Sequence, residues 1–166
     1  MTVDSYAFLP RAFRPMYEAA PQFDHDPVWA PFDAPLSEAR IGLLSSAGIF
    51  LAGEQEPFDV ERERREPTWG DPTLRVIPNG VEQSQLDATH LHINTSDLLT
   101  DMNVALPIRR LNELADAGVI GSASPEHYSV MGFQESGAEV WRTTTGPEIA
   151  ARCHAADIDA LILAPA

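Results

Sequence analysis

The chain has 166 residues, 44% of them hydrophobic, which is enough to close one core and predicts a single compact domain. Its 11 basic residues stand against 25 acidic ones, and the resulting net charge of -14 repels nucleic-acid phosphates and anionic membrane surfaces alike. All 11 basic residues are arginine, which excludes a Schiff-base amine, a P-loop lysine and a lysine general base.

The single cysteine, Cys153, excludes an intrachain disulfide, a CxxC redox pair and a cysteine-rich zinc site. The amino terminus, MTVDSYAFLP, has no basic cap followed by an apolar core. No window of the sequence approaches the roughly 18 apolar residues of a membrane span. We therefore expect a cytoplasmic protein without nucleic-acid or membrane partners.

The first half of the chain predicts an irregular arm followed by strands. Residues 1–37 are rich in proline and aromatic residues without sustained periodicity, which is typical of an arm. The apolar run IGLL, residues 41–44, predicts a buried strand that opens into a loop. DVERERREPTWGDP, residues 59–72, predicts a loop or a short helix that stops at its prolines. LRVIP (74–78) and THLHINT (89–95) predict a second and a third strand.

The second half predicts two helices. ALPIRRLNELADAG, residues 105–118, has apolar residues at helical spacing, with Pro107 near its start and Gly118 just past its end. TGPEIAARCHAADI, residues 145–158, repeats this signature with Thr145 as the expected cap. Cys153 lies inside this second helix, and we expect it to fill space rather than to react.

Between and after these helices, GVIGS (118–122) predicts a brief extended piece and DALILAP (159–165) predicts a buried final strand. Strands and helices therefore alternate along the chain. This order predicts an α/β fold with a three-layer, mostly parallel sheet, Rossmann-like or flavodoxin-like, in one domain over residues 1–166.

Two histidines, His90 and His92, stand two positions apart in the predicted strand 89–95. Alternate side chains of a strand share a face, so their Cα atoms would lie roughly 6.5 to 7 Å apart and both imidazoles could reach one cation. The alternative is a polar stripe in which the rings only hydrogen-bond on a sheet face. Neutral histidines could also act as general acid and base without a metal.

Carboxylates follow these histidines directly. Asp97 and Asp101 stand in the loop expected to leave the carboxyl end of the strand, where open α/β sheets place ligands. Imidazoles with a carboxylate would suit zinc, iron or copper, with an open position for water or substrate.

The arginines of the charged stretch have two interpretations. Arg62, Arg64 and Arg65 either belong to a solvated face, paired with Asp59 and Glu61, or hold a substrate carboxylate bidentately in a chain without lysine. SSAGIF, residues 45–50, offers free backbone amides but no GxGxxG or GKS/T signature, so no nucleotide is expected. The absence of a GxSxG elbow disfavours a serine hydrolase.

Six segments, in this order over nearly the whole chain, resemble the selenoprotein B family of glycine, sarcosine, betaine and D-proline reductases. They are YAFLPRAFRPMYE, DVERERREPTWGDPTLRVIP, HLHINTSD, NVALPIRRLNELADAGVIG, EHYSVMGF and PEIAARCHAADIDALILAP. The resemblance is closest to the short, free-standing members. In the reductases a redox segment with selenocysteine or cysteine follows the strand that DALILAP resembles, and attacks a substrate activated by a partner subunit. Here the sequence ends at Ala166 and Cys153 does not match that position, so the resemblance implies the scaffold without its redox centre.

The resemblance implies an enzyme that acts on a small, amino-acid-like substrate, with His127 of EHYSVMGF as a third family-like histidine. We expect catalytic residues at His90, His92, His127 and Asp97, substrate ligands at Arg62, Arg65 and Asn94, and metal ligands at His90, His92, His127 and Asp101. The alternative is a non-catalytic subunit that docks to, or presents substrate to, a protein carrying the reactive thiol. A homo-oligomer is compatible with either.

Overall fold

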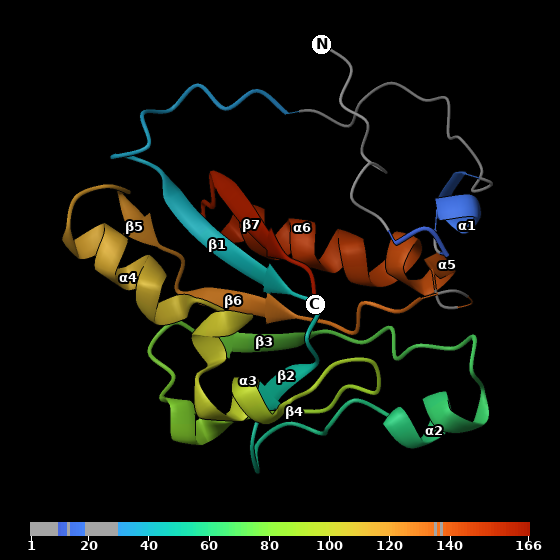
Figure 1. The fold of residues 1–166 in the computed structure, drawn as a ribbon. Coiled ribbons are helices and arrows are strands. Elements are labelled where there is room, and N and C mark those ends of the chain that lie inside the picture. Colours follow the sequence, from blue (N-terminus) through green and yellow to red (C-terminus); the bar gives the residue numbers. More distant parts are fainter. Residues whose placement is uncertain (1–9, 13, 19–29, 135, 137) are drawn as a thin grey trace. The chain divides into compact units, whose positions relative to one another are not determined.

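The computed structural model describes residues 10–12, 14–18, 30–134, 136 and 138–166 (Figure 1). By its internal contacts the chain divides into two units, Met1–Pro31 and Phe32–Ala166. In the first unit the short helix α1, Arg14–Glu18, is described. Most of the predicted arm, residues 1–37, lies outside the described residues, and the single-domain organisation stays a prediction.

Five strands of the second unit form the main sheet. They are β1 (Arg40–Ser45), β3 (Arg75–Pro78), β5 (Ser122–Ala123), β6 (Glu126–Ser129) and β7 (Ala160–Ala164). β1 is central, because it pairs in parallel with β7 on one side and with β5 and then β6 on the other (Figure 1). β3 joins the outer side of β6 in antiparallel orientation. The prediction of an α/β fold with a mostly parallel sheet is confirmed, and the sheet is curled; its three-layer, Rossmann-like or flavodoxin-like assignment stays a prediction.

A separate antiparallel pair is formed by β2 (Ile49–Leu51) and β4 (Leu86–Ala88). β2 follows the end of β1 after a turn at Gly48, whose φ is +65°. A Cβ on Gly48 would lie 2.1 Å from the carbonyl oxygen of Thr89, so only glycine allows the residue after β4 to approach here. The sequence predicted a loop after residue 44 and did not anticipate this pair.

The predicted third strand, residues 89–95, is wrong. The strand is β4, which ends at Ala88, and the next residues form bends that lead into helix α3, Ser96–Thr100. Side chains take the place of a strand partner in this segment: the His92 backbone N–H donates to Nδ1 of His90, and the Ser96 N–H donates to Oδ1 of Asn94. Such local bonds compete with a sheet ladder, and alternation alone does not reveal them.

The helical elements of the second unit are α2 (Val60–Arg65), α3, the 3₁₀ turns η1 (Gln83–Gln85) and η2 (Met102–Val104), α4 (Ile108–Asp116), α5 (Ala138–Val140), the π-helical turn η3 (Trp141–Thr145) and α6 (Gly146–Ala155). The two predicted helices form as α4 and α6, and the short helix offered for residues 59–72 forms as α2; the other helical segments were not predicted. α4 follows Pro107 and ends before Gly118, as predicted, with a φ of +69° at that glycine. Thr145 occupies the N-cap position of α6, but its side chain makes no capping hydrogen bond. It has helical angles inside a run that starts at residue 138, and its hydroxyl donates to the carbonyl of Pro72 at 2.6 Å.

The core lies between the main sheet and the helical segments α3, η2 and α4. Ile41 and Leu43 of β1 are buried with Ile108 and Leu111 of α4 in one apolar cluster. β7 forms as predicted but is not buried, because it is an edge strand: among its residues Leu163 is 64% exposed. No helix in the described part of the chain is long and apolar enough to cross a membrane.

Candidate functional site

The parallel strands β1, β6 and β7 end at one edge of the sheet, where open α/β folds place ligands. Ser46, directly after β1, joins the strand ends. Its backbone N–H donates to the carbonyl of Ala164 at 3.2 Å, and its hydroxyl accepts from the N–H of Ala166 at 2.8 Å. The last residue therefore lies beside the end of the central strand (Figure 1).

Both histidines of the HLHIN segment reach this edge through Thr89, whose N–H donates to the carbonyl of Gly48 at 3.0 Å. The His90 and His92 rings have centroids 5.8 Å apart and are nearly perpendicular, at 82°. The two side chains therefore contact one another from a bend and do not project in parallel from a strand.

A buried carboxylate from a distant segment joins them. Glu63 of α2 is 3% exposed, and its Oε1 lies 2.9 Å from Nε2 of His92. α2 starts at Asp59, whose side chain accepts from the N–H of Arg62, and this start turns Glu63 inward while Arg62 and Arg64 face solvent. Sequence reasoning missed Glu63, because nothing in the string ERERR marks one of its charges as buried.

The loops that contain Gly70 and Phe133 meet beside His92. Its ring centroid is 5.4 Å from that of Phe133. Gly70 packs directly against Phe133, since a Cβ on Gly70 would lie 1.7 Å from the Phe133 carbonyl oxygen. Gln134 fixes this arrangement by donating from Nε2 to the carbonyls of Asp71, at 2.9 Å, and Met131, at 3.3 Å.

Hydrogen-bond partners are missing at several buried polar atoms of these segments. Among the described residues such atoms are Glu63 Oε2, Thr89 Oγ1, His90 Nε2 and Gln134 Oε1, with Trp141 Nε1 in η3 as a further one. Each unpaired buried polar atom costs about 1 to 3 kcal/mol, so natural proteins keep few of them. Their concentration in the segments around Glu63 and the two histidines marks this cluster as the candidate site.

The protonation state of His90 follows from its surroundings. Burial lowers the pKa of His90 below its ordinary value of 6.5, and the charge of His92 lowers it further, while the Glu63 carboxylate opposes both. His90 is therefore neutral at pH 7. Because its Nδ1 accepts from the His92 N–H, its proton lies on Nε2. The Ser46 backbone is near this ring, but Nε2 forms no hydrogen bond of ordinary geometry. The buried polar atoms of the cluster without a partner of ordinary geometry are thus the His90 Nε2 N–H and the second Glu63 carboxylate oxygen.

The structure does not bring His127 into this cluster. It is fully buried on β6, where Nδ1 accepts from the Leu43 N–H at 3.2 Å and Nε2 lies 2.9 Å from Oδ1 of Asn79. Burial lowers the pKa of His127 to about 4. Both nitrogens are engaged by neighbours that hold the imidazole neutral, which is the environment of a structural histidine rather than of a metal ligand or proton carrier.

The predicted set of metal ligands is therefore not assembled. No group of three or more histidine, cysteine, aspartate or glutamate side chains in the described part of the chain is positioned to hold a metal ion. Asp101 caps η2, with Oδ1 accepting from both the backbone and the side chain of Asn103, and these bonds lower the pKa of its carboxyl. Asp97 is exposed in the first turn of α3.

Most of the expected substrate ligands have structural contacts instead. Arg62 pairs with Glu66 and lies over the ring of Trp69, with 4.2 Å between the guanidinium carbon and the ring centroid. Asn94 accepts from the Ser96 N–H before α3. Arg65 is exposed, and no hydrogen bond or ion pair to a described residue engages its guanidinium.

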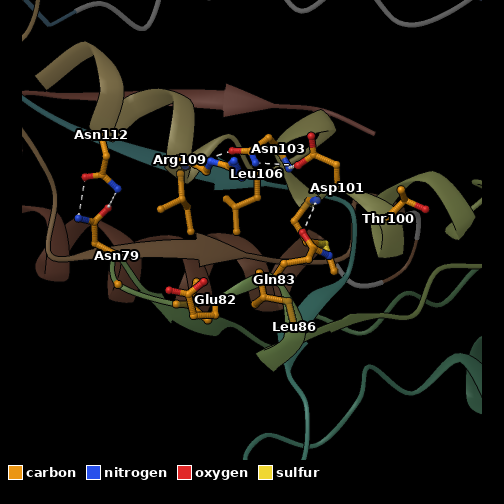
Figure 2. A pocket seen from close by; sticks show the side chains of 14 residues that line it. Asn79, Glu82, Gln83, Leu86, Thr100, Asp101, Asn103, Leu106, Arg109 and Asn112 are labelled. Atoms are coloured by element: carbon orange, nitrogen blue, oxygen red, sulfur yellow. Dashed lines mark hydrogen bonds between the residues drawn. The ribbon is translucent and has the colours of Figure 1, made fainter. Parts of the chain in front are cut away.

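A cavity of about 460 Å³ lies elsewhere, between the turn after β3, η2 and the first turns of α4 (Figure 2). Asp101 lines it, but no histidine does. His127 does not line the cavity, but it hydrogen-bonds to Asn79, which does.

Comparison with known proteins gives one family. Residues 11–166 match the family model described as glycine/sarcosine/betaine reductase selenoprotein B. No curated protein and no solved structure matches the chain. The family match covers nearly the whole chain, including both the cluster around Glu63 and the cavity.

Proposed function

Because the chain belongs to the glycine/sarcosine/betaine reductase selenoprotein B family, we propose that it acts on a small, amino-acid-like substrate at the cluster of Glu63, His90 and His92. One observation carries this proposal. The buried Glu63 carboxylate binds His92 through one oxygen and keeps the other oxygen without a partner. A buried acceptor left free in this way suits a ligand that brings a hydrogen-bond donor.

The chemistry of this pair is proton transfer. A carboxylate hydrogen-bonded to one ring nitrogen fixes the orientation of an imidazole and leaves its other nitrogen to exchange protons. The leaving group of a reductive cleavage has to take up a proton. His92, with its side chain 54% exposed beside the buried Glu63, is suited to deliver it.

The reducing thiol or selenol would come from outside the described residues. In the family reductases the redox segment follows the strand that β7 resembles. The end of β7 contacts Ser46 at the edge that also carries His90, which supports a thiol reaching the cluster from this side. Cys153 is not suited to this role, because it lies within α6 and burial raises the pKa of its thiol.

A transition metal is a separate element of the proposal. Zinc, iron or copper would have to use His90 and His92 together with ligands from the substrate or a partner. The described residues supply no third ligand.

The second candidate function is a non-catalytic subunit that presents substrate to a thiol-bearing protein. The observation that favours it is the outer edge of β7, where Ile162 and Leu163 are 47% and 64% exposed. An apolar edge strand is suited to pairing with another protein. Under this alternative the histidines would not take part in chemistry.

One reconstitution separates the two candidates. An extract of the native organism from which the chain has been deleted is supplied with a dithiol, then with glycine, sarcosine or betaine, and amine release is measured. Wild-type chain should restore release, whereas His92→Asn and Glu63→Gln should restore at most about one hundredth of it. His154→Asn, at an exposed histidine of α6, is the matched control and should restore release fully. Equal rescue by all variants would favour the presenting subunit, and no rescue by the wild-type chain would refute both.

A further inference from the structure

The cavity between β3 and α4 has the dimensions of a small-molecule site. Its volume of about 460 Å³ falls within the range of ligand pockets. Figure 2 shows Leu106 on one side of the hollow and Leu86 on the other. Val81 and Ile108 add to this apolar lining, while polar side chains stand at its margins.

Hydrogen bonds of side-chain amides bridge the two sides of this cavity at each end. At one end Asn79 and Asn112 form a reciprocal pair, with N···O distances of 2.9 and 3.1 Å (Figure 2). At the other end Gln83 accepts from the Met102 N–H at 2.8 Å and donates to the carbonyls of Leu98 and Leu99. Because both ends are bridged, the space between them exists before any ligand binds.

One basic residue, Arg109, lines this cavity. It is exposed, and its guanidinium makes no hydrogen bond or ion pair with a described residue, although its charge acts on the Asp101 carboxyl. Its neighbour Arg110 pairs with Glu113 at 2.8 Å. The nearby carboxylate of Asp101 already accepts two hydrogen bonds from Asn103. In a chain of net charge -14, an arginine that lines a cavity without a hydrogen-bonded or ion-paired partner is the group that a ligand carboxylate would satisfy.

We propose that this cavity binds a small carboxylate with a short branched apolar body. The carboxylate pairs with Arg109, and the apolar body lies between Leu86 and Leu106. Glu82 and Asp101 also line the cavity, so the ligand carboxylate has to pair directly with Arg109 to offset their repulsion. This site shares no residue with the cluster of Glu63, His90 and His92, so the inference does not rest on the proposed function.

The test uses the full chain and three probes of matched shape: isovalerate, isoamyl alcohol and isoamylamine. Each is titrated into ¹⁵N-labelled protein, and amide shifts locate the bound probe. Isovalerate should shift the Gly80 backbone amide and the side-chain amides of Asn79 and Asn112, and it should bind more tightly than the alcohol or the amine. Arg109→Gln should weaken isovalerate about tenfold or more, because a charge-assisted pair is lost.

Arg110→Gln is the matched control, since Arg110 neighbours Arg109 in α4 but does not line the cavity. It should leave the affinity for isovalerate unchanged, and Glu82→Gln should leave it unchanged or raise it. The proposal is overturned if Arg109→Gln and Arg110→Gln behave alike, if isoamylamine binds most tightly, or if isovalerate shifts no resonance at the cavity. Both arginine variants change exposed side chains, so each should fold.

Discussion

Nε2 of His92 lies 2.9 Å from Oε1 of Glu63, and the two side chains differ sharply in exposure, at 54% for His92 and 2% for Glu63. The accessible partner is therefore the imidazole, while the carboxylate is enclosed by protein. Such a pair stabilises the fold only as long as both members are present, because a buried carboxylate without its partner retains the cost of desolvation.

Replacing the exposed member should destabilise the protein. His92→Ala removes the hydrogen bond to Glu63 and should lower the free energy of unfolding by about 1 to 3 kcal/mol, measured by urea denaturation. The double variant Glu63→Leu/His92→Ala should recover part of that loss, because both polar partners are gone. His154→Ala, at an exposed histidine, should change stability little. Equal stabilities of His92→Ala and His154→Ala would contradict the pairing.

His127 should make stability depend on pH. Burial lowers the pKa of His127 from 6.5 to about 4, so between these values the unfolded chain binds a proton that the folded chain does not. The stability that neutral His127 contributes is fully present above pH 6.5 and is lost as the pH falls toward 4. The free energy of unfolding lost over this range is about 3 kcal/mol. His127→Gln should therefore lose less stability than the wild type between pH 7 and pH 4.5 in urea denaturation. Parallel losses in both proteins would mean that His127 is protonated in the folded state.

The sequence predicted elements well where local chemistry decides them. α4 lies where Pro107 and Gly118 indicated, because proline is compatible with a helix start and glycine with the left-handed residue after its end. β1 and β3 were found from short apolar runs. β6 was missed, because EHYS is half polar and becomes buried only between β1 and β3.

The candidate site was predicted only in part, because its members come from two distant segments. His90 and His92 were identified from the sequence, but the strand geometry assigned to them was wrong. Glu63 could not be recognised within a run of charges, since its burial depends on how α2 packs. His127 was singled out as a family-like histidine, and the structure places its ring nitrogens against Leu43 and Asn79 instead.

Cys153 should react slowly with alkylating agents. Burial raises the pKa of its thiol, so little thiolate is present at pH 7.5, and the thiolate is the reactive form. Iodoacetamide should therefore modify the folded chain more slowly than the same chain in urea, and the rate should rise steeply at higher pH. Cys153→Ser should leave amine release in the reconstitution nearly intact. Fast alkylation of the folded protein at pH 7.5 would instead identify a reactive thiol.

The neighbours of His90 should shift its pKa in opposite directions. The Glu63 carboxylate raises the pKa of His90 and the charge of His92 lowers it, against a larger lowering by burial. Glu63→Gln should therefore lower the pKa of His90 further, whereas His92→Asn should raise it toward 6.5, each followed by NMR titration of ¹⁵N-labelled histidine. Asp97→Asn, which removes an exposed carboxylate of α3, should leave the pKa of His90 unchanged. If both cluster variants moved it in the same direction, the three side chains would not share one site. Opposite shifts would mean that the imidazole of His90 stays neutral at pH 7 because burial and His92 together outweigh Glu63.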